Sequence, residues 1–149
     1  MLVSPKRASV HIFSADNVSR TPVDGAAALV DTLFDTQLTA EMLAGMERAT
    51  GFGAASIGQV VNTHANGDHT HGNGLCTKAE VIASESSARE MESFTPQMLK
   101  AFMDSADALG ETGDFLKAVF GSFDFAKVAE KLPTRTFNGA LTVTVGDKA

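Results

Sequence analysis

The sequence predicts an α/β fold, with a partly parallel sheet and crossover helices between its strands. Short β-prone runs occupy residues 9–14, 26–30, 57–63 and 80–84. A helix predicted over residues 39–49 separates the second run from the third, and residues 85–132 carry apolar side chains at helical spacing. Strands that alternate with helices are typical of sheets with parallel neighbours.

Local signals support the elements of the first half. The run Ala26–Val30 is apolar throughout and short, as expected of a strand buried on both faces. Thr39 is a candidate N-cap for the following helix, whose apolar residues recur at helical spacing as far as Ala49. Gly51 suits the position just past the end of that helix.

The second half is predicted to be helical and then extended. Thr95-Pro96 has the pattern of an N-cap followed by proline in the first turn. The phenylalanines between residues 94 and 125 have a spacing that favours a core role over a substrate-pocket wall. Asp124 is expected to cap a last helix, and Asn138-Gly139 to form the turn of a C-terminal hairpin.

Length, charge and composition exclude several classes of protein. A chain of 149 residues suits one domain, and its single cysteine agrees with a reducing compartment. The net charge is −6 and the basic residues are scattered, which argues against nucleic-acid binding. Apolar runs are too short for a membrane span or a secretory leader, so we expect a cytoplasmic protein.

The sequence carries weaker signals for two other kinds of functional site, a dinucleotide-binding loop and a nucleophilic cysteine. Gly51-Phe52-Gly53 has the spacing of the first two glycines of a dinucleotide-binding loop, but Ser56 stands where the third is required. The segment also follows a helix and precedes a strand, which reverses the required order. Cys76 is a candidate nucleophile, although a lone cysteine more often serves as a small buried residue.

A polar loop after the third β-prone run carries the strongest chemical signal. It contains three histidines, an asparagine and an aspartate: His64, Asn66, Asp68, His69 and His71. Imidazole and carboxylate groups are the ligands that suit zinc and similar ions, and Gly67 allows the backbone to bend. The pattern predicts a metal site, the alternative being a loop whose histidines only form hydrogen bonds.

This loop resembles the zinc-binding signature of the metallo-β-lactamase-fold hydrolases, H-x-H-x-D-H, which stands here as His64-x-Asn66-x-Asp68-His69. The strand before it and the upstream strand that ends in Asp31 match that family, as does Gly72-Asn73. The resemblance implies a metallo-β-lactamase-like αββα sandwich. We expect residues 1–149 to form a single domain that supplies only the N-terminal sheet and helices of this sandwich.

The resemblance also implies roles for residues in the loop. The metal ligands it implies, for one or two zinc ions, are His64, Asn66, Asp68 and His69. Asp31 and His71 are expected to orient these ligands without binding the metal themselves. A metal-bound hydroxide would attack an ester, thioester, lactone or related acyl substrate, and Asp68 would be catalytic by orienting the water.

The sequence departs from the family pattern in two respects. Asn66 replaces a histidine, and no histidine follows His71, whereas the family draws further ligands from a second half. We therefore expect weak binding of about one ion and poor hydrolysis by the isolated chain. The alternative function is a truncated, non-catalytic half-domain that acts as a binding or assembly module. We expect a homodimer through a free sheet face, or a partner that supplies the second half.

Overall fold

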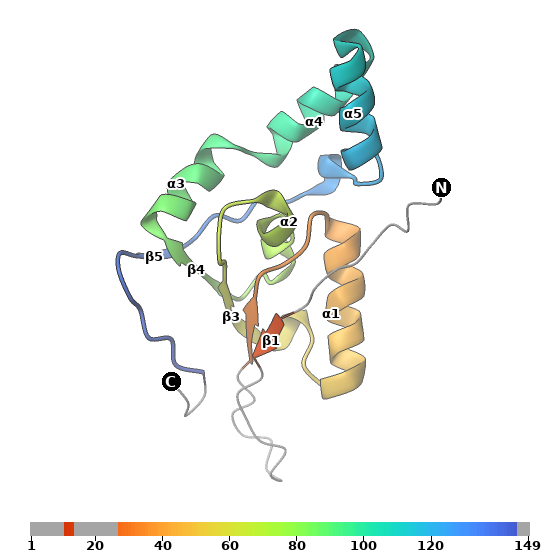
Figure 1. Ribbon diagram of the computed structural model, residues 1–149. Helices are drawn as coiled ribbons and strands as arrows, with labels where there is room; N and C mark the ends of the chain where they lie inside the picture. The colour runs from red at the N-terminus through yellow and green to blue at the C-terminus, as the bar shows by residue number, and fades with distance from the viewer. Residues whose placement is uncertain (1–10, 14–26, 146–149) are drawn as a thin grey trace.

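The computed structural model describes residues 11–13 and 27–145, which form a five-stranded sheet flanked by helices (Figure 1). The strands in sheet order are β1 (His11–Phe13), β2 (Ala27–Val30), β3 (Ile57–Val61), β4 (Glu80–Ser84) and β5 (Arg135–Phe137). β1 is antiparallel to β2, and every other neighbouring pair is parallel. The predicted α/β class with a partly parallel sheet is confirmed.

Helices provide the crossovers between the parallel strands. The α-helices are α1 (Thr36–Thr50), α2 (Gly67–Thr70), α3 (Glu85–Ser93), α4 (Pro96–Asp104) and α5 (Glu111–Phe120). The 3-10 turns are η1 (Ala54–Ser56), η2 (Asn73–Leu75), η3 (Ala106–Leu109) and η4 (Phe125–Lys127). α1 connects β2 to β3, and α3 to α5 lie between β4 and β5 (Figure 1). Within the described residues, these helices lack the combined length and apolar character needed to cross a membrane.

The core lies between α1 and one face of the sheet. Leu29, Val60 and Val81 are in register on adjacent strands and are fully buried. They pack in one cluster with Leu43 and Met46 of α1. Burial of apolar surface stabilises this arrangement by about 25 cal/mol per Å2, so this cluster fixes the strands that lead to the polar loop.

The start of α1 differs from the prediction. Asp35, not Thr39, is the N-cap, and its Oδ1 accepts a hydrogen bond from the Leu38 amide at 2.8 Å. The helix therefore begins one turn earlier than expected. Thr39 is buried in the first turn, where its hydroxyl donates to the Asp35 carbonyl at 2.9 Å. The predicted end is confirmed, since Gly51 adopts a left-handed conformation with φ of 82°.

α4, η3 and α5 together form a projection, here called the helical arm (residues 96–120), which rises away from the sheet (Figure 1). The prediction that the phenylalanines serve mainly as core is wrong for several of them. Phe94, Phe102 and Phe115 are 49%, 43% and 63% exposed, whereas Phe125 is buried. Helical spacing aligned these side chains on one face, but the arm extends beyond the sheet that would cover that face.

The C-terminal segment also differs from the predicted helix and hairpin. After Asp124 the chain forms η4 in place of the predicted helix. Asp124 Oδ1 caps η4 by accepting a hydrogen bond from the Ala126 amide at 3.1 Å. β5 then pairs in parallel with β4, and residues 138–144 form no strand. The Thr134 amide donates to the Val81 carbonyl at 2.8 Å, so this segment extends the sheet beside β4.

The homodimer through a free sheet face stays a prediction. The face of the sheet opposite the Leu29 side carries Ala28 and Ile82, which are 6% and 0% exposed. The large exposed apolar side chains of the described residues lie instead between residues 94 and 119. Light scattering at low micromolar concentration tests this prediction, and a stable monomer would contradict it.

Candidate metal centre

The candidate centre lies at the carboxyl ends of β2 and β3. Asp31 directly follows β2, and the loop with His64 follows β3. Parallel strands end at the same edge of a sheet, where ligands of α/β proteins commonly bind. Ligand atoms of Asp31, His64 and His69 all lie within 4.8 Å of one another, and α2 carries His69 over this edge (Figure 1).

Asp31 is held rigidly at this edge. Its backbone is left-handed, with φ of 60°, a conformation that aspartate adopts more readily than most residues. Its amide donates to the Val61 carbonyl at 2.9 Å, and its Oδ1 accepts from the Thr63 amide at 2.8 Å. The carboxylate therefore fastens the end of β2 to the segment that leads into the loop.

A chain of hydrogen bonds orients the rings of the two histidines. Asp31 Oδ2 lies 2.9 Å from Nδ1 of His69 and 2.7 Å from the Thr63 hydroxyl, which donates to it. The same hydroxyl lies 2.8 Å from Nδ1 of His64 and has only its lone pairs to offer there. In a neutral ring these contacts favour the proton on Nδ1 of both histidines, the form in which each Nε2 has a lone pair for a metal ion.

Asp68 lies beside this cluster, next to His69. Its Oδ2 lies 3.3 Å from Nε2 of His69, and its side chain is 56% exposed. Two ligands of a tetrahedral zinc ion, each about 2.1 Å from the metal, lie about 3.4 Å apart. The separation of these two atoms therefore fits a shared ion, and the imidazole and carboxylate donors fit the chemistry of zinc.

The predicted ligands are only partly brought together. The three-residue cluster contains Asp31 with His64 and His69, because both oxygens of Asp31 lie at hydrogen-bond distance from the loop. These bonds suit the expected supporting role of Asp31 rather than ligation. Asn66 is the N-cap residue of α2 but makes no side-chain capping bond. The ligand roles of His64, Asn66, Asp68 and His69 stay predictions.

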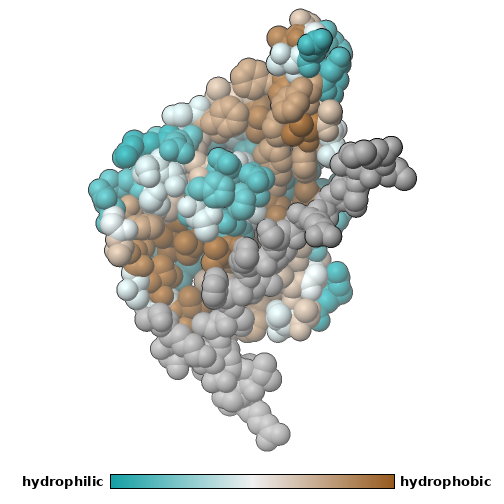
Figure 2. Space-filling view, in the orientation of Figure 1, coloured by the Kyte–Doolittle hydropathy of each residue, from teal (hydrophilic) through white to brown (hydrophobic). Residues whose placement is uncertain are grey.

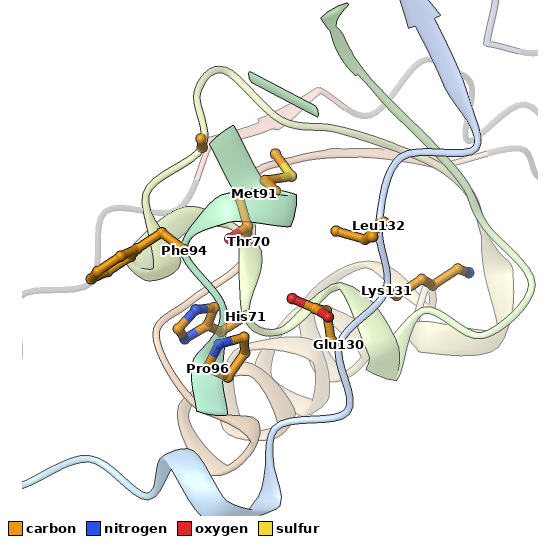
Figure 3. Close-up of a pocket in the computed structure, with 9 residues that line it drawn as sticks. Thr70, His71, Met91, Phe94, Pro96, Glu130, Lys131 and Leu132 are labelled. Atoms are coloured by element: carbon orange, nitrogen blue, oxygen red, sulfur yellow. The ribbon is translucent and has the colours of Figure 1, made fainter. Parts of the chain in front are cut away.

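The ring of His71 contacts Phe34. Its Nδ1 is 3.2 Å from the Phe34 carbonyl, and its ring stacks on that of Phe34 with a centroid distance of 5.4 Å. The ring borders a cavity of about 20 Å3 near Pro96, which has room for about one water molecule (Figure 3). Burial lowers the pKa of His71, so its neutral form predominates at pH 7. The polar contact of its ring is thus with the Phe34 backbone, and its expected support of the metal ligands stays a prediction.

Sequence reasoning missed the side chains that hold the loop backbone at His69. Asn62 donates from Nδ2 to the His69 carbonyl at 2.9 Å, and the Thr32 amide donates to the same oxygen at 2.8 Å. Fully buried Asn73 donates to Asn62 Oδ1 at 2.8 Å. The signal was present, since Thr32, Asn62 and Thr63 are polar residues at the ends of buried strands.

A cluster of imidazole and carboxylate groups at the ends of parallel strands defines a candidate metalloprotein of the α/β class. Residues 21–142 match the sequence model of the metallo-beta-lactamase superfamily. The chain therefore belongs to the metallo-beta-lactamase superfamily. No curated protein matches it significantly.

Solved structures of this superfamily are similar to the chain. The metallo-beta-lactamase FIM-1 from Pseudomonas aeruginosa, in its mono-zinc form, is 26% identical over 45% of this chain and 29% of its own, with a TM-score of 0.38. A metallo-beta-lactamase from Pontibacter korlensis is 16% identical over 95% of this chain and 55% of its own, with a TM-score of 0.48. AidC, a dizinc quorum-quenching lactonase, is 22% identical over 70% of this chain and 40% of its own, with a TM-score of 0.39. The chain thus spans 29% to 55% of the length of these structures.

Proposed function

We propose that the chain carries part of the centre of a metal-dependent hydrolase that acts on an ester, thioester, lactone or related acyl substrate. The observation that supports this most directly is the hydrogen-bond chain through Asp31 and Thr63. Its acceptors favour the forms of neutral His64 and His69 that are protonated on Nδ1, and these forms present Nε2 to a metal ion. Membership of the superfamily supports the same proposal.

The residues of the loop have distinct parts in this proposal. His64, His69 and Asp68 hold a zinc-like ion, with Asn66 as a neutral fourth candidate. Zinc polarises a carbonyl group and lowers the pKa of the water it binds to about 7. Asp68 has an exposed carboxylate at the edge of the cluster, where it accepts a hydrogen bond from the attacking water and so orients it.

Zinc binding is the first test. Isothermal titration of the metal-free chain should show about one ion per chain, with binding weakening below about pH 6 because the ligands must be deprotonated. The double variant Asp68→Ala, His69→Ala should lose this binding. The matched control is His71→Gln, which replaces a histidine of the same loop that bonds Phe34 instead of the cluster.

Hydrolysis of a panel of activated esters and thioesters is the second test. With zinc added, the isolated chain should turn over near background, because no histidine follows His71 in its sequence. Robust zinc-dependent turnover that is lost in His64→Ala would support the hydrolase and overturn the expectation of an incomplete site. Unchanged zinc content in the Asp68, His69 double variant would refute the ligand assignment.

A further inference from the structure

A large open hollow begins at the candidate metal loop and continues between Phe34 and the helical arm. Its volume is about 700 Å3, within the range of small-molecule sites. One end is formed by Asn66, Gly67 and Asp68. The hollow therefore reaches a candidate metal ligand directly. The small cavity beside His71 shares Ala65 and Phe94 with this hollow and has room for about one water molecule.

The remaining wall of the hollow is mainly apolar and aromatic. Its apolar side chains are Phe34, Phe94, Leu99, Phe102, Leu116 and Phe120. Phe34 makes edge-on contacts with Phe120 and Phe125, at centroid distances of 5.7 and 5.0 Å. Phe94 and Phe102 are 49% and 43% exposed. Brown, hydrophobic surface follows α4 and α5 in Figure 2.

The charges around the hollow have one sign. Asp68 and Glu90 are the charged residues of its described lining, and both are acidic. Neither lysine nor arginine lines it among the described residues. A carboxylate or phosphate group on a ligand would meet like charge along this wall, which disfavours anionic ligands.

From this combination we infer that the hollow binds the uncharged aryl or long alkyl group of an acyl substrate, with the reacting group at the Asp68 end. The assignment of the reacting end rests on the proposed function. The apolar binding itself does not depend on a metal ion, because the wall is formed by side chains of α3, α4, α5 and Phe34.

Fluorescence titration with the neutral probe N-phenyl-1-naphthylamine tests the wall in metal-free protein. We expect saturable binding that weakens about tenfold in the double variant Phe94→Ala, Phe102→Ala, because two aromatic contacts are lost. The matched control is Leu109→Ala, Phe115→Ala, which removes side chains that are 42% and 63% exposed but lie outside the hollow. This control should bind the probe as the unchanged chain does. Equal weakening in both double variants would overturn the inference.

A second titration tests the charge preference with the anionic probe 8-anilinonaphthalene-1-sulfonate. Glu90→Gln should strengthen binding of this anion several-fold and leave binding of the neutral probe unchanged. Glu92→Gln is the control, since Glu92 is exposed on the same helix but does not line the hollow. An anion affinity that is unaffected by Glu90→Gln would contradict the charge argument.

The results separate this inference from the proposed hydrolase. Neutral-probe binding that follows the predicted variant pattern, in a chain that binds no zinc, would support the apolar site while the hydrolase proposal fails. Zinc binding at the loop without a difference between the two double variants would overturn the apolar site alone. Circular dichroism and thermal unfolding of every variant show whether a loss of probe binding reflects a loss of fold.

Discussion

Two regions of the molecule bury their apolar side chains to very different extents: the layer formed by α1 and the sheet, and the helical arm. Leu29, Val60 and Val81 are fully buried between α1 and the sheet, whereas Phe115 on the arm is 63% exposed. Both regions have apolar residues at regular spacing, so the pattern predicts each element equally well. Spacing determines which side chains share a face, but a second packing element must lie opposite that face before it becomes core.

The largest expected effect is on the packed side of this comparison. Leu29→Ala should lower the free energy of unfolding by about 2–5 kcal/mol, since it leaves a cavity in a close-packed cluster. Phe115→Ala should change it by no more than about 0.5 kcal/mol, because the side chain is mostly in solvent. Chemical denaturation measures both values. Equal destabilisation would mean that the arm is buried in solution.

Substitution at the contact between the polar loop and α1 should lower the free energy of unfolding by a slightly smaller amount. A Cβ atom at Gly72 would overlap Oγ1 of buried Thr39, so one of the two segments must move. Gly72→Ala should therefore cost about 1–3 kcal/mol, as overpacking of a core does. Gly58→Ala is the control, because a Cβ there meets nothing within 4 Å. Denaturation midpoints that are equal for the two variants would rule out this close approach.

The segment between η4 and β5 is expected to be stabilised by one lysine, Lys131. Nζ of Lys131 donates to the carbonyls of Cys76 and Ala79, each at 2.7 Å, and to that of Thr77 at 3.0 Å. Lys131→Met should cost about 1–3 kcal/mol, because these carbonyls lose a charged donor. Lys100→Met removes only an exposed ion pair with Asp104 and should cost less than about 1 kcal/mol. Thermal unfolding of the two variants distinguishes these expectations.

The smallest effect concerns the thiol in the core. Burial raises the pKa of Cys76, and nearby Lys131 partly offsets this. The folded chain therefore holds the thiol proton more tightly than the unfolded chain does. The stability from this group is fully present below about pH 8.5 and is lost as the pH rises through the folded pKa.

A thiol reagent such as dithionitrobenzoate measures this protection directly. At pH 8 the native chain should react slowly, at a rate that rises with denaturant. Cys76→Ala removes the titrating group, so its denaturation midpoint should decline less above about pH 8.5 than that of the unchanged chain. Rapid reaction of the native chain would show that the thiol is accessible.

The strands and the loop could be predicted because their signals are local. Short apolar runs, Gly51 after a helix and the spacing of His64, Asp68 and His69 can all be recognised within a few residues of sequence. Asp35 was missed as a cap because Thr39 is an equally good capping residue, and only the fold places Thr39 against Gly72. The position of His71 likewise depends on Phe34, which is 37 residues away.

Asp31 shows that a position can be predicted from the sequence while its hydrogen-bond partners cannot. Its place at the end of β2 could be predicted, but its bond to the Thr63 hydroxyl joins residues 32 positions apart. The alternative between a C-terminal hairpin and parallel pairing with β4 also depends on a distant strand. Sequence periodicity describes one element at a time, whereas these contacts arise from the register between elements.

Substitution at Asp31 is constrained by two independent requirements. Its left-handed backbone disfavours most side chains, and asparagine or glycine would meet that requirement as well as aspartate does. Glycine offers no acceptor, and the amide of asparagine would present hydrogen atoms to one of the groups that now donate to the two carboxylate oxygens. An Asp31→Asn chain would thus keep its backbone path yet lose at least one of these hydrogen bonds. Of the residues that suit this backbone, only aspartate offers acceptors to the Thr63 amide, the Thr63 hydroxyl and the His69 ring together.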